Sequence, residues 1–327
     1  MLDTSTMLEF VRPVRADLDE FDRKLSDHLR GDSPLIGSIA RHLLRTEGKR
    51  IRPAFLFLSS RAAGNFTQCS VDASLVIELI HTATLLHDDV VDDAEIRRGL
   101  KTVNARWTNL ISVLMGDYLF AKAFRIMVET ESVELMKAIS RATERVSVGE
   151  LRQIEETGNY DLSEDEYLSI IADKTASLFS LSCEAGPILA RRSSRERQQL
   201  AAFGEKVGTA FQIADDLLDF VGDAELTGKE PGNDVLTGKV TLPLIHSLKK
   251  AGRTSQRELI KQLQSNGGEE SFKFVLDFVS HNGGIEYAYR RANELGQQGL
   301  EAIDGIQASV YLDSLTRMVQ FTTARAS

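Results

Sequence analysis

The chain has 327 residues, 27% of them charged, and a formal net charge of −9. This acidic balance, with no basic stripe and no aromatic stacking module, argues against nucleic acid as a partner. The sequence lacks both an apolar run of roughly 18 residues that would span a membrane and a signal-peptide core. Only two cysteines occur, which excludes a disulfide framework and favours a reducing compartment. We therefore expect a soluble, cytoplasmic protein.

Helical periodicity dominates the sequence. Apolar residues recur at helical spacing, as Leu75, Leu79 and Leu86 do. Prolines are few, and long stretches such as 54–186 contain none, which suits long helices. Alternating runs typical of strands are lacking, and so are linkers and internal repeats. We predict an all-α fold and a single domain over residues 1–327.

A basic loop over residues 48–53 is the first candidate binding element. Lys49 and Arg52 lie three residues apart after Gly48, and Pro53 suits the first turn of a following helix. Cationic side chains in such a loop are natural partners of a diphosphate. An ordinary solvated basic loop is the alternative.

The first acidic cluster, Asp88, Asp89 and Asp92, has the pattern D-D-x-x-D at the end of an apolar helical run. Residues four apart share a helix face, so Asp88 and Asp92 are predicted to point the same way. His81 and Thr84 continue this stripe towards the N-terminus. His81 is therefore either a hydrogen-bonded core histidine or a substrate contact.

Further basic residues follow this cluster. Arg97 and Arg98 come five residues after it, and guanidinium groups bind phosphate oxygens through bidentate hydrogen bonds. The alternative for this pair is a solvated helix end. Lys174, Thr175 and Lys239 lie further along, and spacing alone places them on the surface.

The second acidic cluster, Asp215, Asp216 and Asp219, repeats the pattern of the first and has Gln212 just before it. A loop over residues 228–234 follows, rich in glycine and proline, with Lys229 near its start. Its composition fits a lid that closes over a polyanion and excludes water. A plain surface loop is the alternative.

Two carboxylate clusters with matching neighbours indicate a metal site. Two unit charges 4 Å apart repel by about 4 kcal/mol at an effective dielectric constant of about 20, so a cation is needed between them. Hard oxygen ligands with no cysteine nearby favour Mg²⁺, which binds carboxylates, waters and the oxygens of a substrate phosphate. The alternative is a pair of acidic, solvated helix ends.

Together these motifs resemble the trans-polyprenyl diphosphate synthases, most closely the long-chain octaprenyl, heptaprenyl and solanesyl types. The resemblance covers nearly the whole chain, and it rests on residues 48–53, 86–92, 97–99, 116–117, 174–175, 211–219 and 228–229. One departure is Glu47, where the family often has a second glycine. That family implies an isoprenoid synthase helical bundle around a central cavity, usually a homodimer.

The resemblance also implies a role for each motif. Asp88, Asp92 and Asp215 would bind Mg²⁺ directly, about three ions per active site, with Asp89, Asp216 and Asp219 helping through water or as neighbours. The residues implied around the allylic diphosphate are Arg97, Lys174, Thr175, Gln212, Lys229 and Lys239. Those implied around isopentenyl diphosphate are Lys49, Arg52, His81 and Arg98.

These roles imply an ionisation and coupling reaction. The allylic C–O bond of farnesyl or geranyl diphosphate would ionise, with Mg²⁺ and the lysines stabilising the charge on the leaving diphosphate. The double bond of isopentenyl diphosphate would then attack the cation. No side chain is an obvious base, so the departed diphosphate is expected to take the proton.

Product length is expected to depend on the residues four and five places before the first aspartate, Thr84 and Ala83. In the family bulky aromatics there give short products, and neither residue here is bulky. We therefore expect a product of about C35 to C45 for quinone side chains, with peripheral membrane contact for its release. Phe120 and Phe124 are candidates for the floor of the tunnel.

Other functions remain open at this stage. A shorter-chain synthase (about C15 to C25) and the catalytic subunit of a hetero-oligomeric heptaprenyl synthase fit the same motifs. His87 and Asp88 also match helical metal-dependent phosphohydrolases, but the other histidines are not arranged as further ligands. Terpene cyclases typically replace the second cluster with an Asn/Ser/Glu pattern, which Asp215 and Asp219 argue against.

Overall fold

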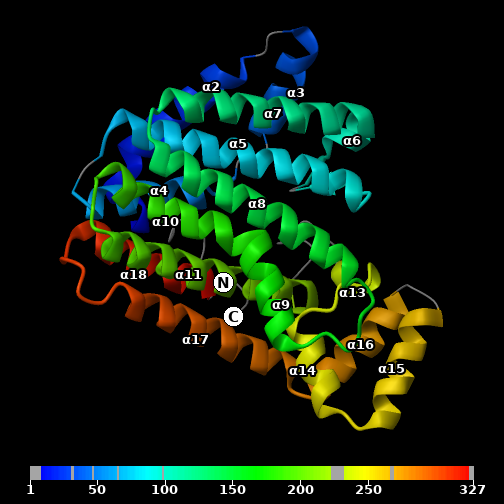
Figure 1. Cartoon of the computed structure of the whole chain (residues 1–327). Coiled ribbons are helices and arrows are strands. Elements are labelled where there is room, and N and C mark those ends of the chain that lie inside the picture. Colours follow the sequence, from blue (N-terminus) through cyan, green and yellow to red (C-terminus); the bar gives the residue numbers. More distant parts are fainter. Residues whose placement is uncertain are drawn as a thin grey trace.

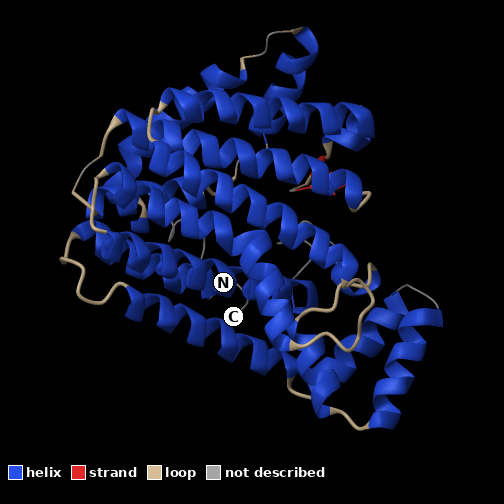
Figure 2. Cartoon of the chain, in the orientation of Figure 1, coloured by secondary structure: helices blue, strands red, loops and turns tan. Residues whose placement is uncertain are grey.

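The computed structural model describes residues 9–30, 33–45, 48–64, 66–97, 99–221, 232–265 and 269–323. Nearly all of this part of the chain is helical (Figure 2), which confirms the predicted all-α fold. The elements are η1 (Arg12–Val14), α2 (Arg15–Leu29), α3 (Pro34–Arg45), α4 (Ile51–Ala62), α5 (Gln68–Val91), β1 (Ile96–Arg97), β2 (Leu100–Lys101), α6 (Val103–Arg106), α7 (Asn109–Glu129), α8 (Val133–Glu155), α9 (Glu164–Ile171), η2 (Ala172–Ala176), α10 (Ser177–Leu189), α11 (Ser194–Val221), α13 (Asn233–Leu236), α14 (Leu242–Lys250), α15 (Arg253–Ser265), α16 (Glu269–His281), α17 (Gly284–Ala302) and α18 (Val310–Thr323).

Among the long helices, α7 packs against α5, α10 packs against α8 and α11, and α11 packs against α17. In Figure 1, α7, α5, α8, α11 and α17 follow one another from top to bottom with nearly parallel axes. A first hydrophobic core joins the N-terminal helices to α10 and the start of α11, and its largest fully buried side chains include Phe55, Phe57, Phe179 and Phe203. Aromatic rings of this size remove much apolar surface from water. This core holds α5 and α10 at the centre of the molecule.

A second hydrophobic core lies under the C-terminal half. It joins α9, the end of α11, α14, α16 and α17 through buried residues such as Leu217, Leu242, Val275 and Ala292. Packing of this kind fixes the rotation of α11 about its axis, because one stripe of the helix must face the core. The second aspartate cluster is therefore held at a defined angle.

Helix starts follow the capping chemistry of the sequence. The side chains of Thr108 and Ser132 accept hydrogen bonds from backbone N–H groups three residues later, which begins α7 and α8. Ser163 and Glu166 form a capping box at α9. Pro53 lies in the first turn of α4, as predicted from its place after the basic loop.

The helix α5 is long and apolar enough to cross a membrane, but 67% of its apolar window is buried inside the molecule. Burial on this scale is what a central core helix requires. The helix ends at Val91, and Asp92 caps it just before Asp93, which has a left-handed φ of 48°. The first cluster thus lies at the C-terminal end of α5.

Two local features were not predicted. The two-residue strands β1 and β2 pair antiparallel with Ile96 opposite Lys101, so Arg97 lies in a strand and not at a helix end. The segment η2 is a π-helical turn between α9 and α10. Single π-turns inside α-helices frequently mark functional sites, and this one carries Lys174 and Thr175.

Candidate active site between the aspartate clusters

The three aspartates of the first cluster have different environments. Asp89 is 4% exposed, and its Oδ1 accepts a hydrogen bond of 2.7 Å from Arg97 Nε. Asp88 is partly buried, and Asp92 is more exposed at the helix end. Asp89 therefore anchors the strand that carries Arg97, whereas Asp88 and Asp92 are the more accessible members of the cluster.

Asp88 has a strongly perturbed acidity. Burial raises its pKa to about 7, and the nearby Glu150 carboxylate adds to the shift, while Lys174 and Arg97 oppose it. A carboxyl group raised this far by burial and by like charge is typical of functional sites. A cation beside Asp88 would favour its charged form.

Lys239 connects the two aspartate clusters. Its Nζ lies 3.3 Å from Asp92 Oδ2 and 3.6 Å from Asp234 Oδ1, and the backbone N–H of Asp234 donates to Asp219 Oδ2 at 3.1 Å. Burial opposes the charge on Lys239, but Asp234 and Asp92 outweigh it and raise its pKa. The chain of contacts from Asp92 to Asp219 shows that the clusters face each other, although 127 residues separate their first members.

The second cluster divides its carboxylates in a similar way. Asp215 is exposed and Asp219 partly buried, whereas Asp216 is 6% exposed and turned towards α9. Asp216 accepts hydrogen bonds from the Tyr167 hydroxyl at 2.6 Å and from Gln212 Nε2 at 2.7 Å. Burial and the charge of Asp234 raise the pKa of Asp216, and these two donors oppose the rise.

The π-turn places Thr175 against α11 and Lys174 against α8. Thr175 donates to Gln212 Oε1 at 2.7 Å, and Lys174 Nζ contacts Glu150 and Gln153 of α8. Only 21% of the Lys174 side chain is exposed, so the surface position given by spacing alone is wrong. The same applies to Lys239, whose side chain is 19% exposed.

The predicted residues around isopentenyl diphosphate are only partly described. Arg98 lies outside the described residues, as does Lys229 of the predicted lid. Lys49 lies in the loop two residues before α4, and the Arg52 guanidinium lies 4.9 Å from the Phe179 ring centre.

His81 lines a small cavity between α2, α3, α5 and α7. The cavity has a volume of about 80 Å³, and Arg50, Glu78 and Arg97 border it together with leucine side chains. Arg50 adopts a left-handed φ of 49° and its guanidinium lies 3.1 Å from Glu78 Oε1. The structure thus brings His81 near Arg97, a neighbour that the sequence did not predict.

The two residues predicted to set product length differ in exposure. Ala83 is 0% exposed within the first core, and Thr84 is partly buried, with its hydroxyl bonded to the His81 carbonyl at 2.8 Å. Phe120 packs near His87, with ring centres 6.0 Å apart, whereas Phe124 is 47% exposed. Thr84 is therefore the more accessible of the pair on the Asp88 stripe.

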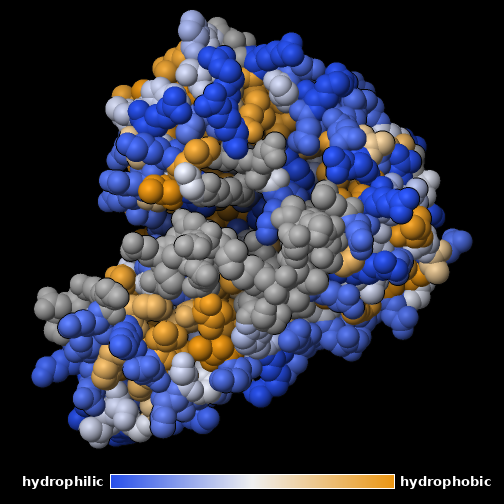
Figure 3. Space-filling view, turned by 180° about the vertical axis from the view of Figure 1, so that it is seen from behind, coloured by the Kyte–Doolittle hydropathy of each residue, from blue (hydrophilic) through white to orange (hydrophobic). Residues whose placement is uncertain are grey.

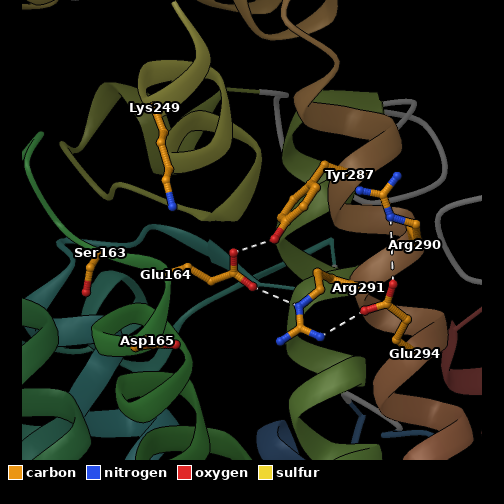
Figure 4. A pocket seen from close by; sticks show the side chains of 8 residues that line it. All are labelled: Ser163, Glu164, Asp165, Lys249, Tyr287, Arg290, Arg291 and Glu294. Carbon is orange, nitrogen blue, oxygen red and sulfur yellow. Dashed lines mark hydrogen bonds and ion pairs between the residues drawn. The ribbon is translucent and has the colours of Figure 1, made fainter.

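A separate pocket of about 390 Å³ contains none of the predicted site residues (Figure 4). It is lined by Ser163, Glu164, Asp165, Lys249, Tyr287, Arg290, Arg291 and Glu294. Its charges largely neutralise each other, since Glu164 binds Tyr287 and Arg291, and Arg291 also binds Glu294. With three acidic and three basic side chains it lacks the positive balance that a diphosphate requires.

The donor set between the clusters fits Mg²⁺ bound together with a diphosphate. Among the described residues no three His, Cys, Asp or Glu side chains converge to hold a metal by themselves. Mg²⁺ usually keeps several waters and takes one or two carboxylates plus substrate phosphate oxygens, so a preformed cage is not needed. Asp88 is partly buried and its pKa is raised by burial and by Glu150, so a cation there would relieve like-charge repulsion. Figure 3 shows a hollow on the rear face of the molecule, with both hydrophilic and hydrophobic residues among the coloured ones around it.

Comparison with known proteins identifies the family. The family model described as "Polyprenyl synthetase" matches residues 33–278. This chain belongs to the polyprenyl synthetase family. The prediction of a trans-prenyltransferase with an isoprenoid synthase fold is confirmed at this level.

Individual members of the polyprenyl synthetase family match over almost their whole length. An all-trans-nonaprenyl-diphosphate synthase (geranyl-diphosphate specific) of Rhodobacter capsulatus is 35% identical over 318 residues, 97% of each chain. An octaprenyl diphosphate synthase of Haemophilus influenzae is 33% identical over 99% of this chain and 98% of its own. A polyprenyl synthase structure from Caulobacter crescentus, complexed with calcium and isoprenyl diphosphate, has a TM-score of 0.93 and 32% identity over 99% of this chain and 98% of its own.

Several residues at this polyprenyl synthetase site were missed from the sequence. Glu150 and Gln153 lie three apart on α8 and meet Lys174, and Asp234 links Lys239 to Asp219. The sequence shows the helical spacing of Glu150 and Gln153, but no neighbouring motif distinguishes these residues from polar residues exposed to solvent. Tyr167, which meets Asp216, was missed for the same reason.

Proposed function

We propose that the chain condenses isopentenyl diphosphate repeatedly onto geranyl or farnesyl diphosphate and gives an all-trans product of about C35 to C45. The observation that carries this proposal is the chain of contacts from Asp92 through Lys239 and Asp234 to Asp219. It brings two carboxylate clusters and a cation to one site. The long-chain products in the names of the similar proteins support the product class.

Binding of the allylic diphosphate is assigned to the cationic groups between the clusters. Lys174, Lys239 and Arg97 are each paired with a carboxylate, so they are already positioned before a ligand arrives. A diphosphate would exchange these contacts for its own oxygens. Pre-positioned charges of this kind stabilise the negative charge that develops on a leaving group.

Asp88, Asp92 and Asp215 are assigned as the side chains that hold Mg²⁺, with Asp89, Asp216 and Asp219 supporting them. When bound, Mg²⁺ would neutralise charge on the diphosphate oxygens, and the family resemblance implies about three ions. Lys229, outside the described residues, is assigned to the same diphosphate.

The second substrate is assigned to a separate set of basic side chains. Lys49, Arg52, His81 and Arg98 would hold isopentenyl diphosphate so that its double bond faces the allylic carbon. Apolar surroundings along α5 would keep water from the cation. The proton lost after coupling is assigned to the departed diphosphate, because no described side chain has an evident role as base.

Assembly as a homodimer is part of the proposal. The face of α7 exposes large aliphatic side chains at helical spacing, with Leu110 68%, Leu114 56% and Val128 60% exposed. Large apolar surfaces of this kind usually mark interfaces, and we assign this one to a second copy of the chain. We further propose that the protein is cytoplasmic and has one domain. Its product would be released at a membrane and used for quinone side chains.

Product analysis of the purified chain tests the proposal. With geranyl or farnesyl diphosphate, isopentenyl diphosphate and Mg²⁺, dephosphorylated prenols of about C35 to C45 are expected on chromatography. Products of about C15 to C25 would favour a short-chain synthase. Activity only after addition of a second protein would favour the catalytic subunit of a hetero-oligomer, and hydrolysis without coupling would exclude a synthase.

A further inference from the structure

The buried carboxylate Asp216 accepts hydrogen bonds from two side chains, one on a different helix and one on its own helix. Its Oδ2 accepts from the Tyr167 hydroxyl of α9, and its Oδ1 accepts from Gln212 one turn earlier on α11. The Tyr167 side chain is 4% exposed and belongs to the second core. The hydroxyl therefore reaches Asp216 from a rigid position.

The network continues beyond these two bonds. Because Gln212 donates its amide N–H to Asp216, its Oε1 is turned away and accepts from the Thr175 hydroxyl at 2.7 Å. The bonds thus link α9, η2 and α11 around one carboxylate.

This network bears directly on the neighbouring aspartates. Asp215 precedes Asp216 and Asp219 follows it by three residues, so all three move together when α11 rotates. A rotation of α11 would change where the carboxylates of Asp215 and Asp219 point. The bond from Tyr167 opposes such a rotation, since losing it would leave a buried carboxylate short of a donor.

We propose that Tyr167 is a positioning residue that orients the second aspartate cluster for binding of divalent cations. The inference rests on the proposed function, in which Asp215 holds Mg²⁺. Tyr167 would act as a residue that does not touch the metal but orients the side chains that do. Removing such a residue typically costs about 10- to 100-fold in metal affinity or activity.

The test is Tyr167→Phe, which removes the hydroxyl and keeps the ring. Binding of Mn²⁺ alone is measured from the electron paramagnetic resonance signal of the unbound ion. The Mn²⁺ dissociation constant should rise about 10-fold or more. The Mg²⁺ concentration for half-maximal activity should rise similarly, while turnover at saturating Mg²⁺ recovers towards the wild-type value, a split that mere loss of stability would not produce.

Tyr160→Phe is the matched control. Tyr160 packs against the same core, and among the described contacts its hydroxyl makes no hydrogen bond to a carboxylate. The Mn²⁺ affinity of Tyr160→Phe should stay within about 2-fold of wild type, because the substitution removes no hydrogen bond to the aspartate cluster. Unchanged Mn²⁺ binding in Tyr167→Phe, or an equal loss in both variants, overturns the assignment.

Asp216→Asn keeps the inference testable if Tyr167→Phe does not fold. If Tyr167 acts through Asp216, this variant weakens Mn²⁺ binding, and the double variant weakens it no further. Normal Mn²⁺ binding by Asp216→Asn contradicts the inference. Condensation by the wild-type protein is measured in parallel. If the wild-type protein does not condense the two substrates, the proposed function alone is refuted. If it does, and Tyr167→Phe binds Mn²⁺ normally, the role of Tyr167 alone is refuted.

Discussion

At the scale of single residues, the site depends on which carboxylates are buried. Asp89 and Asp216 are buried and hydrogen-bonded, whereas Asp92 and Asp215 are exposed. Buried carboxylates need donors, and these are supplied by Arg97 and by Tyr167 with Gln212. The middle aspartate of each D-D-x-x-D pattern thus acts as a support for the outer two.

Asp88 predicts a pH dependence of stability in the metal-free protein. Its pKa in the folded state is raised to about 7 from 3.8, so the folded state retains a proton that the unfolded chain has lost between these values. Its contribution to stability is therefore full below about pH 4 and is lost as the pH rises through about 7.

The variant Asp88→Asn measures this contribution. Between pH 6 and 8 the wild-type protein should lose about 1.4 kcal/mol more unfolding free energy than Asp88→Asn, since one pKa unit corresponds to 1.36 kcal/mol. Urea denaturation in the presence of a chelator gives both values. Equal losses in the two proteins would contradict the assigned environment of Asp88.

The sequence predicted some of this residue-scale picture and not the rest. Asp88 and Asp92 lie on the same face of α5 because they are four residues apart in a helix, so the sequence could predict this. Lys239 was given a surface position because its partner Asp92 is 147 residues away, a contact that only tertiary packing creates. Tyr167 and Glu150 were missed because neither stands in a local motif.

At the scale of elements, the π-turn η2 positions Lys174 by close packing against α8. A Cβ on Gly149 would come within 2.3 Å of the Lys174 backbone nitrogen, so only glycine allows the two segments to approach. The close approach sets the contact of Lys174 with Glu150. The sequence showed the glycine but not the partner that requires it.

Gly149→Ala should therefore displace η2. Overpacking of this kind typically costs about 1–3 kcal/mol, and displacement of Lys174 should also raise the KM for the allylic diphosphate. Gly299→Ala is the control, since the nearest atom to its Cβ would be a Val207 methyl group at 3.2 Å, and the backbone there would be no closer than 3.6 Å. Urea denaturation and steady-state kinetics measure both variants, and similar effects of the two would contradict the role of Gly149.

The two faces of α5 predict how product length responds to larger side chains on this helix. Thr84 and Thr82 each bond to the carbonyl of their own helix, but they lie on different faces, and Thr82 borders the cavity near His81. Thr84→Phe should shorten the product by one or more five-carbon units, whereas Thr82→Phe should not.

Chromatography of dephosphorylated prenols distinguishes the two threonine variants. A product shortened by Thr82→Phe alone would place the tail on the side of α2 and α3. Thr84 is preferred to Ala83 for this test, because Ala83 is fully buried and a large side chain there would also disturb the core.

At the scale of the whole molecule, the two hydrophobic cores carry one cluster each. The first core holds α5 with Asp88 and Asp92, and the second holds the end of α11 with Asp215 and Asp219. Helix periodicity predicted the all-α fold, but two cores joined along α11 could not be read from it. The facing of the clusters is a consequence of how these cores are joined.

The exposed face of α7 predicts a dimer in solution. Leu114→Glu places a charge in this face and should shift the protein from dimer to monomer at micromolar concentration, because an unpaired charge in an apolar interface is costly. Val310→Glu is the control, since Val310 is equally exposed but lies on α18. Sedimentation velocity measures both, and an undisturbed dimer in Leu114→Glu would exclude this face as the interface.

The most direct test of the account is turnover after neutralising one aspartate in each cluster. Asp88→Asn and Asp215→Asn should each lower turnover with farnesyl and isopentenyl diphosphate by about 10²- to 10³-fold, because both clusters must stabilise the leaving diphosphate together. Asp93→Asn, an exposed neighbour that keeps its left-handed backbone conformation with asparagine, should retain activity. Near-normal turnover in either cluster variant, with the fold intact by circular dichroism, would contradict the claim that the two clusters form one active site.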